Sequence, residues 1–372
     1  MKCSPVPFLP TRFLPFSFPP FLRKMKNTLK YLLFLGVAGG LMWYVFKDIP
    51  FDDLLDTFRQ ADYTWVLVSV LLALVAHWSR AVRWCMLMEP MGYRPSVFNA
   101  TLAVWIGYFA NFIVPRMGEV TRCGSLLRTD GVPFEKSFGT VVAERVFDVL
   151  TLLVLIGLNF LLEFDRLSGF FMYFFGNKLS GGGAEKSSGS WLPWALLGIA
   201  VGLLCLVLVV VFNKSLRTKL LQNALAQKIA SFAKGLLDGL LSIRRLRSPA
   251  WFIFHTVLIW TMYYFMSYVL FFSIPQTSGL SMLAGLTILV VGAIGNSAPT
   301  QGGIGAYHVL VGNVVLLYGL SQKAGITLAT FIHGTQMITM LTLGGLAFLV
   351  TLFIQKREAK GQPTVMSSGI GQ

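Results

Sequence analysis

Residues 107–148 read GYFANFIVPRMGEVTRCGSLLRTDGVPFEKSFGTVVAERVFD, with charged side chains between and inside apolar segments. Ionisable groups at membrane depth are costly, so they occur there mainly when they are paired or face a polar cavity. The stretch therefore predicts a functional site inside a membrane domain. Its candidate charged residues are Arg116, Glu119, Arg122, Glu144, Arg145 and Asp148.

The composition of the whole chain agrees with a membrane domain. Of the 372 residues, 55% are hydrophobic and only 13% are charged, whereas about a quarter of the residues of soluble domains are charged. The apolar runs are long and uninterrupted, whereas the strands of a membrane barrel would alternate over about ten residues. We therefore predict an all-α fold, a polytopic bundle of membrane helices.

The positive charge of the chain has a topological explanation. The formal net charge is +15, but the Lys and Arg residues gather in short loops beside apolar segments, as the positive-inside rule describes. Nucleic acid is therefore not an expected partner. The four cysteines and four histidines show no metal-ligand spacing, so we expect no metal and no cofactor.

Three ranges divide the chain. Repeated prolines in residues 1–24 prevent a membrane-spanning helix, and the sequence MKNTLKYLLF starts at Met25, where we expect translation to begin. Residues 25–355 form the predicted transmembrane domain. Residues 356–372 are a polar tail that we expect to be disordered.

Loop charges predict that the stretch that contains the candidate site turns back on itself. The second apolar segment, 63–88, ends near Arg80 and Arg83, an element that we interpret as an anchor reaching the cytoplasmic interface. Residues 214–247 hold eight Lys or Arg residues and one Asp, so they should also be cytoplasmic. An odd number of crossings between these segments would violate the rule, so we expect 97–148 to enter from the cytoplasm and return there as a hairpin.

A second interrupted segment lies near the C-terminus. Two short apolar pieces, 281–294 and 306–318, flank the polar break GNSAPTQGGIG. We interpret them as a hairpin that enters from the outer face, although two full crossings would satisfy the charges equally well. The last apolar segment, 324–354, then returns to the cytoplasm, and both termini are expected on that side of the inner membrane.

Interrupted hydrophobic segments in corresponding places of two halves predict an inverted repeat with a binding site at the bilayer midplane. Arginine and free helix termini would bind an anionic headgroup, and carboxylates would orient the arginines or receive a cationic headgroup. The alternatives are structural ion pairs in the first half and close glycine packing in the second. Besides the six charged residues above, the candidate binding residues are Asn111, Asn296, Pro299, Gln301, Gly302, Gly303 and His308.

Three motifs resemble those of the lysylphosphatidylglycerol synthase transmembrane region family, also called the UPF0104 or flippase-like family. They are NFIVPRMGEVTR, AERVFD and GNSAPTQGGIGAYH, and the resemblance extends over residues 29–354. The resemblance implies that, in larger members, this domain is joined to an aminoacyltransferase domain and moves aminoacylated phosphatidylglycerol between leaflets. This chain is expected to be a stand-alone member. It departs from the pattern at Gln301, where relatives have Pro, and at His308, where they have Glu.

These observations predict a protein that moves an anionic or aminoacylated phospholipid, or a lipid-like amphiphile, between leaflets. No nucleotide-binding P-loop motif is present, so transport would be downhill, ion-coupled or driven by a partner. Two alternatives stay open: an enzyme that modifies phospholipids within the membrane, and a scaffold that does not transport. The expected partners are membrane lipids and a separate lipid-modifying enzyme. Oligomeric state is not predicted by the sequence.

Overall fold

The computed structural model describes residues 40, 43, 51–114, 117–166, 246–298 and 300–361. The apolar segments 29–46 and 191–212, which we expected to cross the membrane, lie largely or wholly outside these residues, as do the basic segment 214–247 and the two chain ends. Every regular element within them is a helix. The all-α prediction is confirmed.

Four of the helices are long and apolar enough to cross a bilayer. They are α3 (Thr64–Met88), α6 (Phe134–Leu162), α12 (Pro249–Tyr268) and α15 (Gln322–Gly361). Large apolar side chains are exposed along all four, for example Leu67, Val154, Val257 and Phe353. Such a surface would be unfavourable in water and fits contact with lipid chains. The fold is that of a polytopic membrane protein.

The first interrupted segment forms a hairpin of two short helices, α4 (Val97–Ile113) and α5 (Gly118–Asp130). The Ser96 backbone N–H donates a 2.8 Å hydrogen bond to Asp130 Oδ1, which joins the two open ends. At the other end, α4 and α5 approach closely, because a Cβ on Gly107 would lie 2.9 Å from the Gly118 carbonyl oxygen.

The hairpin ends earlier than the sequence predicted. We expected it to extend to Asp148, but it closes at Asp130, and Gly131 turns the chain with a φ of +66°. Pro133 then precedes the continuous helix α6, which contains Glu144, Arg145 and Asp148. These charges do not interrupt α6, because arginines of neighbouring helices neutralise its carboxylates.

The second interrupted segment also folds as a hairpin. It consists of α13 (Met282–Asn296), the short turn η7 (Gln301–Gly303) and α14 (Ala306–Val314), which continues into η8 (Val315–Tyr318). At its open end the Thr287 and Tyr318 hydroxyls lie 2.6 Å apart.

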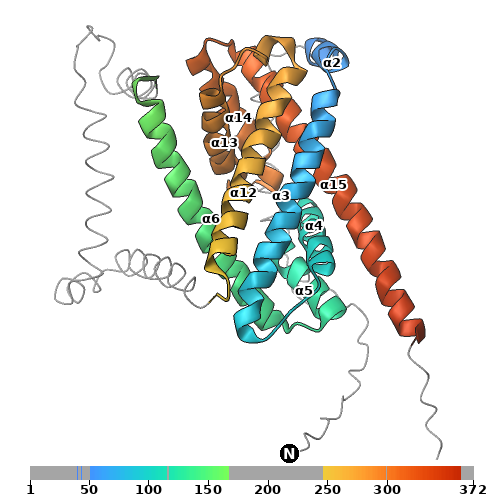
Figure 1. Cartoon of the computed structure of the whole chain (residues 1–372). Helices are drawn as coiled ribbons and strands as arrows, with labels where there is room; N and C mark the ends of the chain where they lie inside the picture. Colours follow the sequence, from blue (N-terminus) through green and yellow to red (C-terminus); the bar gives the residue numbers. More distant parts are fainter. Residues whose placement is uncertain are drawn as a thin grey trace, which may run out of the picture.

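The two hairpins extend from opposite ends of the bundle. In Figure 1, α13 and α14 lie in the upper half, whereas α4 and α5 lie in the lower half. Their tips are adjacent, because a Cβ on Gly302 would lie 3.9 Å from the Phe112 ring. This is the arrangement expected of an inverted pair. That the hairpins re-enter the bilayer from opposite faces stays a prediction.

Each hairpin packs in its own core cluster. In the first cluster, Val104 and Leu126 of the hairpin pack with Trp84 of α3, and in the second, Ile288 and Val311 of the hairpin pack with Leu328 of α15. Cys85 and Cys123 are buried and free. The remaining described elements are α2 (Phe51–Arg59), η2 (Glu89–Met91), η5 (Val269–Ser273) and η6 (Pro275–Thr277).

Candidate functional site

The centre of the charged region is the Glu144 carboxylate of α6. It is fully buried and accepts three guanidinium groups, from Arg80 at 3.1 Å, Arg83 at 3.4 Å and Arg122 at 2.8 Å. The Arg122 guanidinium also lies 4.6 Å from the centroid of the Trp84 ring. One carboxylate of α6 therefore joins α3 to α5.

Asp148 is the second carboxylate of the same helix face, one turn after Glu144. It lies 2.8 Å from Arg80 Nη2, 2.6 Å from Arg83 Nη2 and 3.6 Å from Arg145 Nη1. An outer pair, Glu119 Oε1 with Arg145 Nη2 at 3.1 Å, is more accessible, with the Arg145 side chain 44% exposed. The cluster is therefore fully buried at Glu144 and becomes accessible at the pair of Glu119 and Arg145.

Two members of this cluster were missed from the sequence. We expected Arg80 and Arg83 to reach the membrane interface as anchors, but they are 4% and 0% exposed. They turn inward because α6 offers two carboxylates on the face that packs on α3. Their spacing was the available signal: arginines three residues apart share a helix face, as do carboxylates four residues apart.

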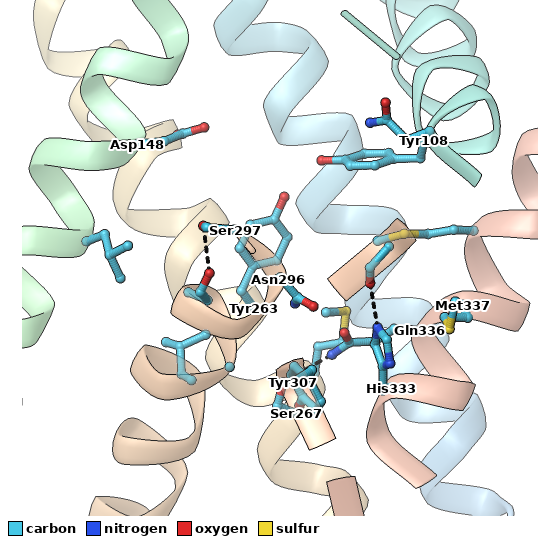
Figure 2. A pocket seen from close by; sticks show the side chains of 18 of the residues that line it. Tyr108, Asp148, Tyr263, Ser267, Asn296, Ser297, Tyr307, His333, Gln336 and Met337 are labelled. Carbon is cyan, nitrogen blue, oxygen red and sulfur yellow. Dashed lines mark hydrogen bonds between the residues drawn. The ribbon is translucent and has the colours of Figure 1, made fainter. Parts of the chain in front are cut away.

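A cavity of about 430 Å³ lies beside the cluster, where the two hairpin tips meet. Its described lining includes residues of both hairpins and of α3, α6, α12 and α15. In Figure 2 the carboxylate of Asp148 and the hydroxyls of Tyr108 and Tyr263 point toward a common space. Arg80 and Arg145 also line the cavity, so the charged cluster forms part of its wall.

The tip of the first hairpin is held by one of the predicted residues. Asn111 lines the cavity, and its Oδ1 accepts a 2.7 Å hydrogen bond from the Gly118 backbone N–H at the start of α5. This bond satisfies a helix-terminal amide that would otherwise lack an intrahelical partner. Asn111 thus fixes the tip, while the role we predicted for it in binding stays a prediction.

The polar break of the second hairpin contributes backbone and small groups. Asn296 and Gly302 line the cavity, and Gly303 lies so close to Asn296 that an added Cβ would be 2.6 Å from its Oδ1. The His333 Nε2–H donates a 2.9 Å hydrogen bond to the Gly302 carbonyl. Arg116 and Pro299, and the side chain of Gln301, lie outside the described residues.

The histidines are arranged differently from our expectation. His255 bonds Ser79 Oγ through Nδ1 at 2.8 Å and is a satisfied core residue. His308, which we expected at the cavity, is buried in α14 against His333, with ring centroids 5.1 Å apart. Among the described residues, His77 and His333 line the cavity instead.

Several buried polar atoms in the cavity wall have no hydrogen-bond partner among the residues that the structure describes. They are Arg80 Nε, His77 Nδ1, His333 Nδ1 and Trp260 Nε1. Buried polar groups usually have a partner, so such atoms beside a cavity indicate a place where water or a ligand binds. The described residues contain no cluster of His, Cys, Asp and Glu suited to a metal ion.

Comparison with known proteins relates this arrangement to membrane proteins. A UPF0104 membrane protein of Methanocaldococcus jannaschii is 28% identical over 152 residues, which are 40% of this chain and 44% of the relative. A UPF0104 membrane protein of Pyrococcus horikoshii is 24% identical over 141 residues, 37% of this chain and 41% of the relative. The glycosyltransferase AglD of Haloferax volcanii is 26% identical over 107 residues, 28% of this chain and 17% of that protein.

These alignments cover less than half of each relative. No solved structure matches the chain significantly. The model of the lysylphosphatidylglycerol synthase transmembrane region matches residues 31–344, which include both hairpins and the ion cluster. With four helices that can cross a bilayer, this match identifies a multi-pass membrane protein of a lipid-related family. The chain belongs to the lysylphosphatidylglycerol synthase transmembrane region family.

Proposed function

We propose that this protein moves an anionic or aminoacylated phospholipid, or a similar amphiphile, between the two leaflets of the inner membrane. The observation that carries the proposal is the cavity between the hairpin tips, with ion-paired residues in its wall. A headgroup crosses hydrocarbon only if polar groups replace its water. The cavity offers such groups in a bundle whose outer surface is apolar.

The size of the cavity supports transport of the headgroup with the chains left in lipid. About 430 Å³ falls in the range of small-molecule sites, which are roughly 300–1,000 Å³. That volume suits a headgroup rather than a whole two-chain lipid. In this arrangement the hairpin tips and α6 contact the headgroup, and the acyl chains slide along the apolar helix faces.

The proposal includes an orientation. The positive-inside rule favours both termini in the cytoplasm, with the base of the first hairpin near the cytoplasmic face and the base of the second near the outer face. Labelling of single cysteines placed near residues 130 and 279 in intact cells would test it. Opposite accessibility of the two positions is expected, and equal accessibility would contradict this orientation.

The transport test uses purified protein in liposomes with fluorescent lipids, and follows leaflet exchange by dithionite quenching. Ala293 lines the cavity from α13, whereas its neighbour Ile294 is 47% exposed and lies outside the described lining. Ala293→Phe should fill the cavity and abolish exchange. Ile294→Phe, the matched control, should retain it. Equal exchange by both variants would remove the cavity from the proposed path.

The same liposomes separate the alternatives. Chemical conversion of the headgroup, followed by mass spectrometry, would identify a membrane-embedded enzyme. No exchange and no conversion by well-folded protein would favour a scaffold for a separate lipid-modifying enzyme. The described geometry favours transport over catalysis, because Glu144 and Asp148 are both held by arginines and neither is free to act as a base.

A further inference from the structure

The cavity wall carries more positive than negative charge. Among the described residues that line it, the basic side chains are Arg80 and Arg145, and the acidic one is Asp148. Behind the wall, Arg83 and Arg122 face the single buried carboxylate of Glu144. With Glu119, the partner of Arg145, the described cluster holds four arginines and three carboxylates, each carboxylate paired with an arginine, so it carries one positive charge in excess.

Asp148 is already occupied as an acceptor. Three guanidinium groups lie within 3.6 Å of its carboxylate oxygens, contributed by α3 and by α6 itself. A cationic group on a ligand would have to displace one of these arginines and would meet the others at short range. Like charges repel strongly where water is excluded. The carboxylate therefore positions arginines and does not offer a site for an amine.

Two of the four unpartnered atoms in the wall are donors. Arg80 Nε and Trp260 Nε1 are buried N–H groups without a partner among the described residues, whereas His333 Nδ1 is an acceptor because Nε2 carries the proton. The Tyr108 and Tyr263 hydroxyls point into the same space in Figure 2 and hydrogen-bond each other, so one of their two protons remains for a ligand. Arg145, at the accessible edge, is paired with Glu119 at 3.1 Å and lies 3.6 Å from Asp148, and the remaining N–H donors of its guanidinium can bind phosphate oxygens.

We infer that the cavity selects a headgroup with a negatively charged phosphate and no amine over an aminoacylated headgroup. This inference rests on the proposed function for the lipid nature of the ligand. It narrows the substrate class to acidic phospholipids such as phosphatidate and phosphatidylglycerol. Arg80 and Arg145 bind the phosphate, and Asp148 holds those two arginines in position.

Competition binding tests this selectivity directly. The purified full chain in detergent is incubated with equimolar dioctanoyl phosphatidate, phosphatidylglycerol and lysylphosphatidylglycerol, and bound lipid is counted by native mass spectrometry. We expect the two acidic lipids to bind at least about tenfold more tightly than the lysyl lipid, the effect of one charge-assisted contact. Equal or preferred binding of the lysyl lipid would overturn the inference.

Variants at the accessible edge link selectivity to the named groups. Arg145→Gln should lose about tenfold in affinity for phosphatidate, and Arg145→Glu should shift the preference toward the lysyl lipid. Because the Arg145 side chain is half-exposed, both variants should fold, which circular dichroism checks. Arg94→Gln, on an exposed loop arginine, is the control and should bind like the parent chain. Unchanged selectivity in both Arg145 variants would contradict the assignment.

Two further arms separate this inference from the transport proposal. Inorganic phosphate and glycerol phosphate should fail to displace bound phosphatidate at equal concentration, and full displacement would show that the ligand is a soluble phosphate instead. Selective binding without leaflet exchange in liposomes would refute transport alone. Exchange of acidic and lysyl lipids at equal rates would refute the selectivity alone.

Discussion

The two hairpins are held in place by different forces. The first, α4 and α5, is bound to α6 through ion pairs: Arg122 to Glu144 at 2.8 Å and Glu119 to Arg145 at 3.1 Å. The second, α13 and α14, spans residues 281–318 without a single Lys, Arg, Asp or Glu. The first hairpin is therefore anchored through charge, although its described residues in the cavity wall, Tyr108, Asn111 and Phe112, are uncharged. The second hairpin contributes backbone groups and shape.

Close packing takes the place of charge in the second hairpin. An added Cβ on Gly292 would lie 2.7 Å from the Tyr307 ring, and one on Gly295 would lie 2.8 Å from Tyr307 Cα. The Tyr307 ring in turn stacks on His333, with centroids 4.8 Å apart. Small residues let membrane helices approach in this way where the hydrophobic effect contributes little.

The largest expected effect is loss of the central carboxylate. Glu144→Gln removes the negative charge that Arg80, Arg83 and Arg122 share and replaces one acceptor oxygen by an NH₂ donor. Removal of one partner from a buried ion pair costs about 3–5 kcal/mol. We expect the free energy of unfolding, measured by SDS titration in detergent, to fall by this amount, and the first hairpin to become protease-sensitive before the second.

The matched control is the outer pair of the same hairpin. Glu119→Gln removes a partner of Arg145, but these side chains are 28% and 44% exposed, so solvent replaces the interaction. Accessible ion pairs contribute about 0–1 kcal/mol. If the Glu144 and Glu119 variants lost similar free energies of unfolding, burial would not determine how much each ion pair contributes.

The next largest loss of stability is expected from adding one methyl group in the second hairpin. Gly295→Ala places a methyl group against the backbone of Tyr307, and overpacking of this kind costs about 1–3 kcal/mol. Thermal unfolding in detergent measures the loss. Gly139→Ala in α6, where an added Cβ meets nothing within 4 Å, is the control and should be neutral or slightly stabilising. A stable Gly295 variant would mean that close approach does not hold this hairpin.

The difference between the hairpins also explains what the sequence could predict. Interrupted apolar segments are visible in composition alone, because polar and glycine-rich breaks leave pieces too short for a full crossing. Opposed short helices, and the gathering of Glu119, Arg122 and Glu144, could therefore be predicted. Loop charges supplied the expected direction of each long helix.

Which carboxylates the buried arginines pair with could not be predicted from local sequence patterns. Arg80 and Arg83 read as interface anchors because their chain neighbours are apolar, and only packing of α3 on α6 reveals their acceptors. The end of the first hairpin was misplaced for a related reason. Buried arginines neutralise Glu144 and Asp148, so a sequence that looks interrupted continues as one helix. The burial of His308 likewise depends on its contact with α15.

Hydrogen bonds at the tips allow a finer comparison. Asn111→Ala removes the acceptor for the Gly118 N–H, and loss of a helix cap costs about 1 kcal/mol. His333→Phe removes the donor to the Gly302 carbonyl but keeps a ring against Tyr307, with a similar expected cost. Hydrogen exchange should accelerate at residues 117–121 in the first variant and at 302–306 in the second. Acceleration at both tips in either variant would show that the hairpins open together.

The smallest losses of stability are expected from substitutions at the open ends of the two hairpins. Asp130→Ala removes the acceptor of the Ser96 N–H, and Tyr318→Phe removes the hydroxyl beside Thr287. A typical hydrogen bond contributes about 0.5–1.5 kcal/mol net, and the exposed Ser96 bond should lie at the low end because water competes for it. Tyr318→Phe should therefore lower the melting temperature more than Asp130→Ala does. The opposite order would mean that the base of the first hairpin depends on its closing bond, and that the buried ion pairs do not anchor that hairpin by themselves.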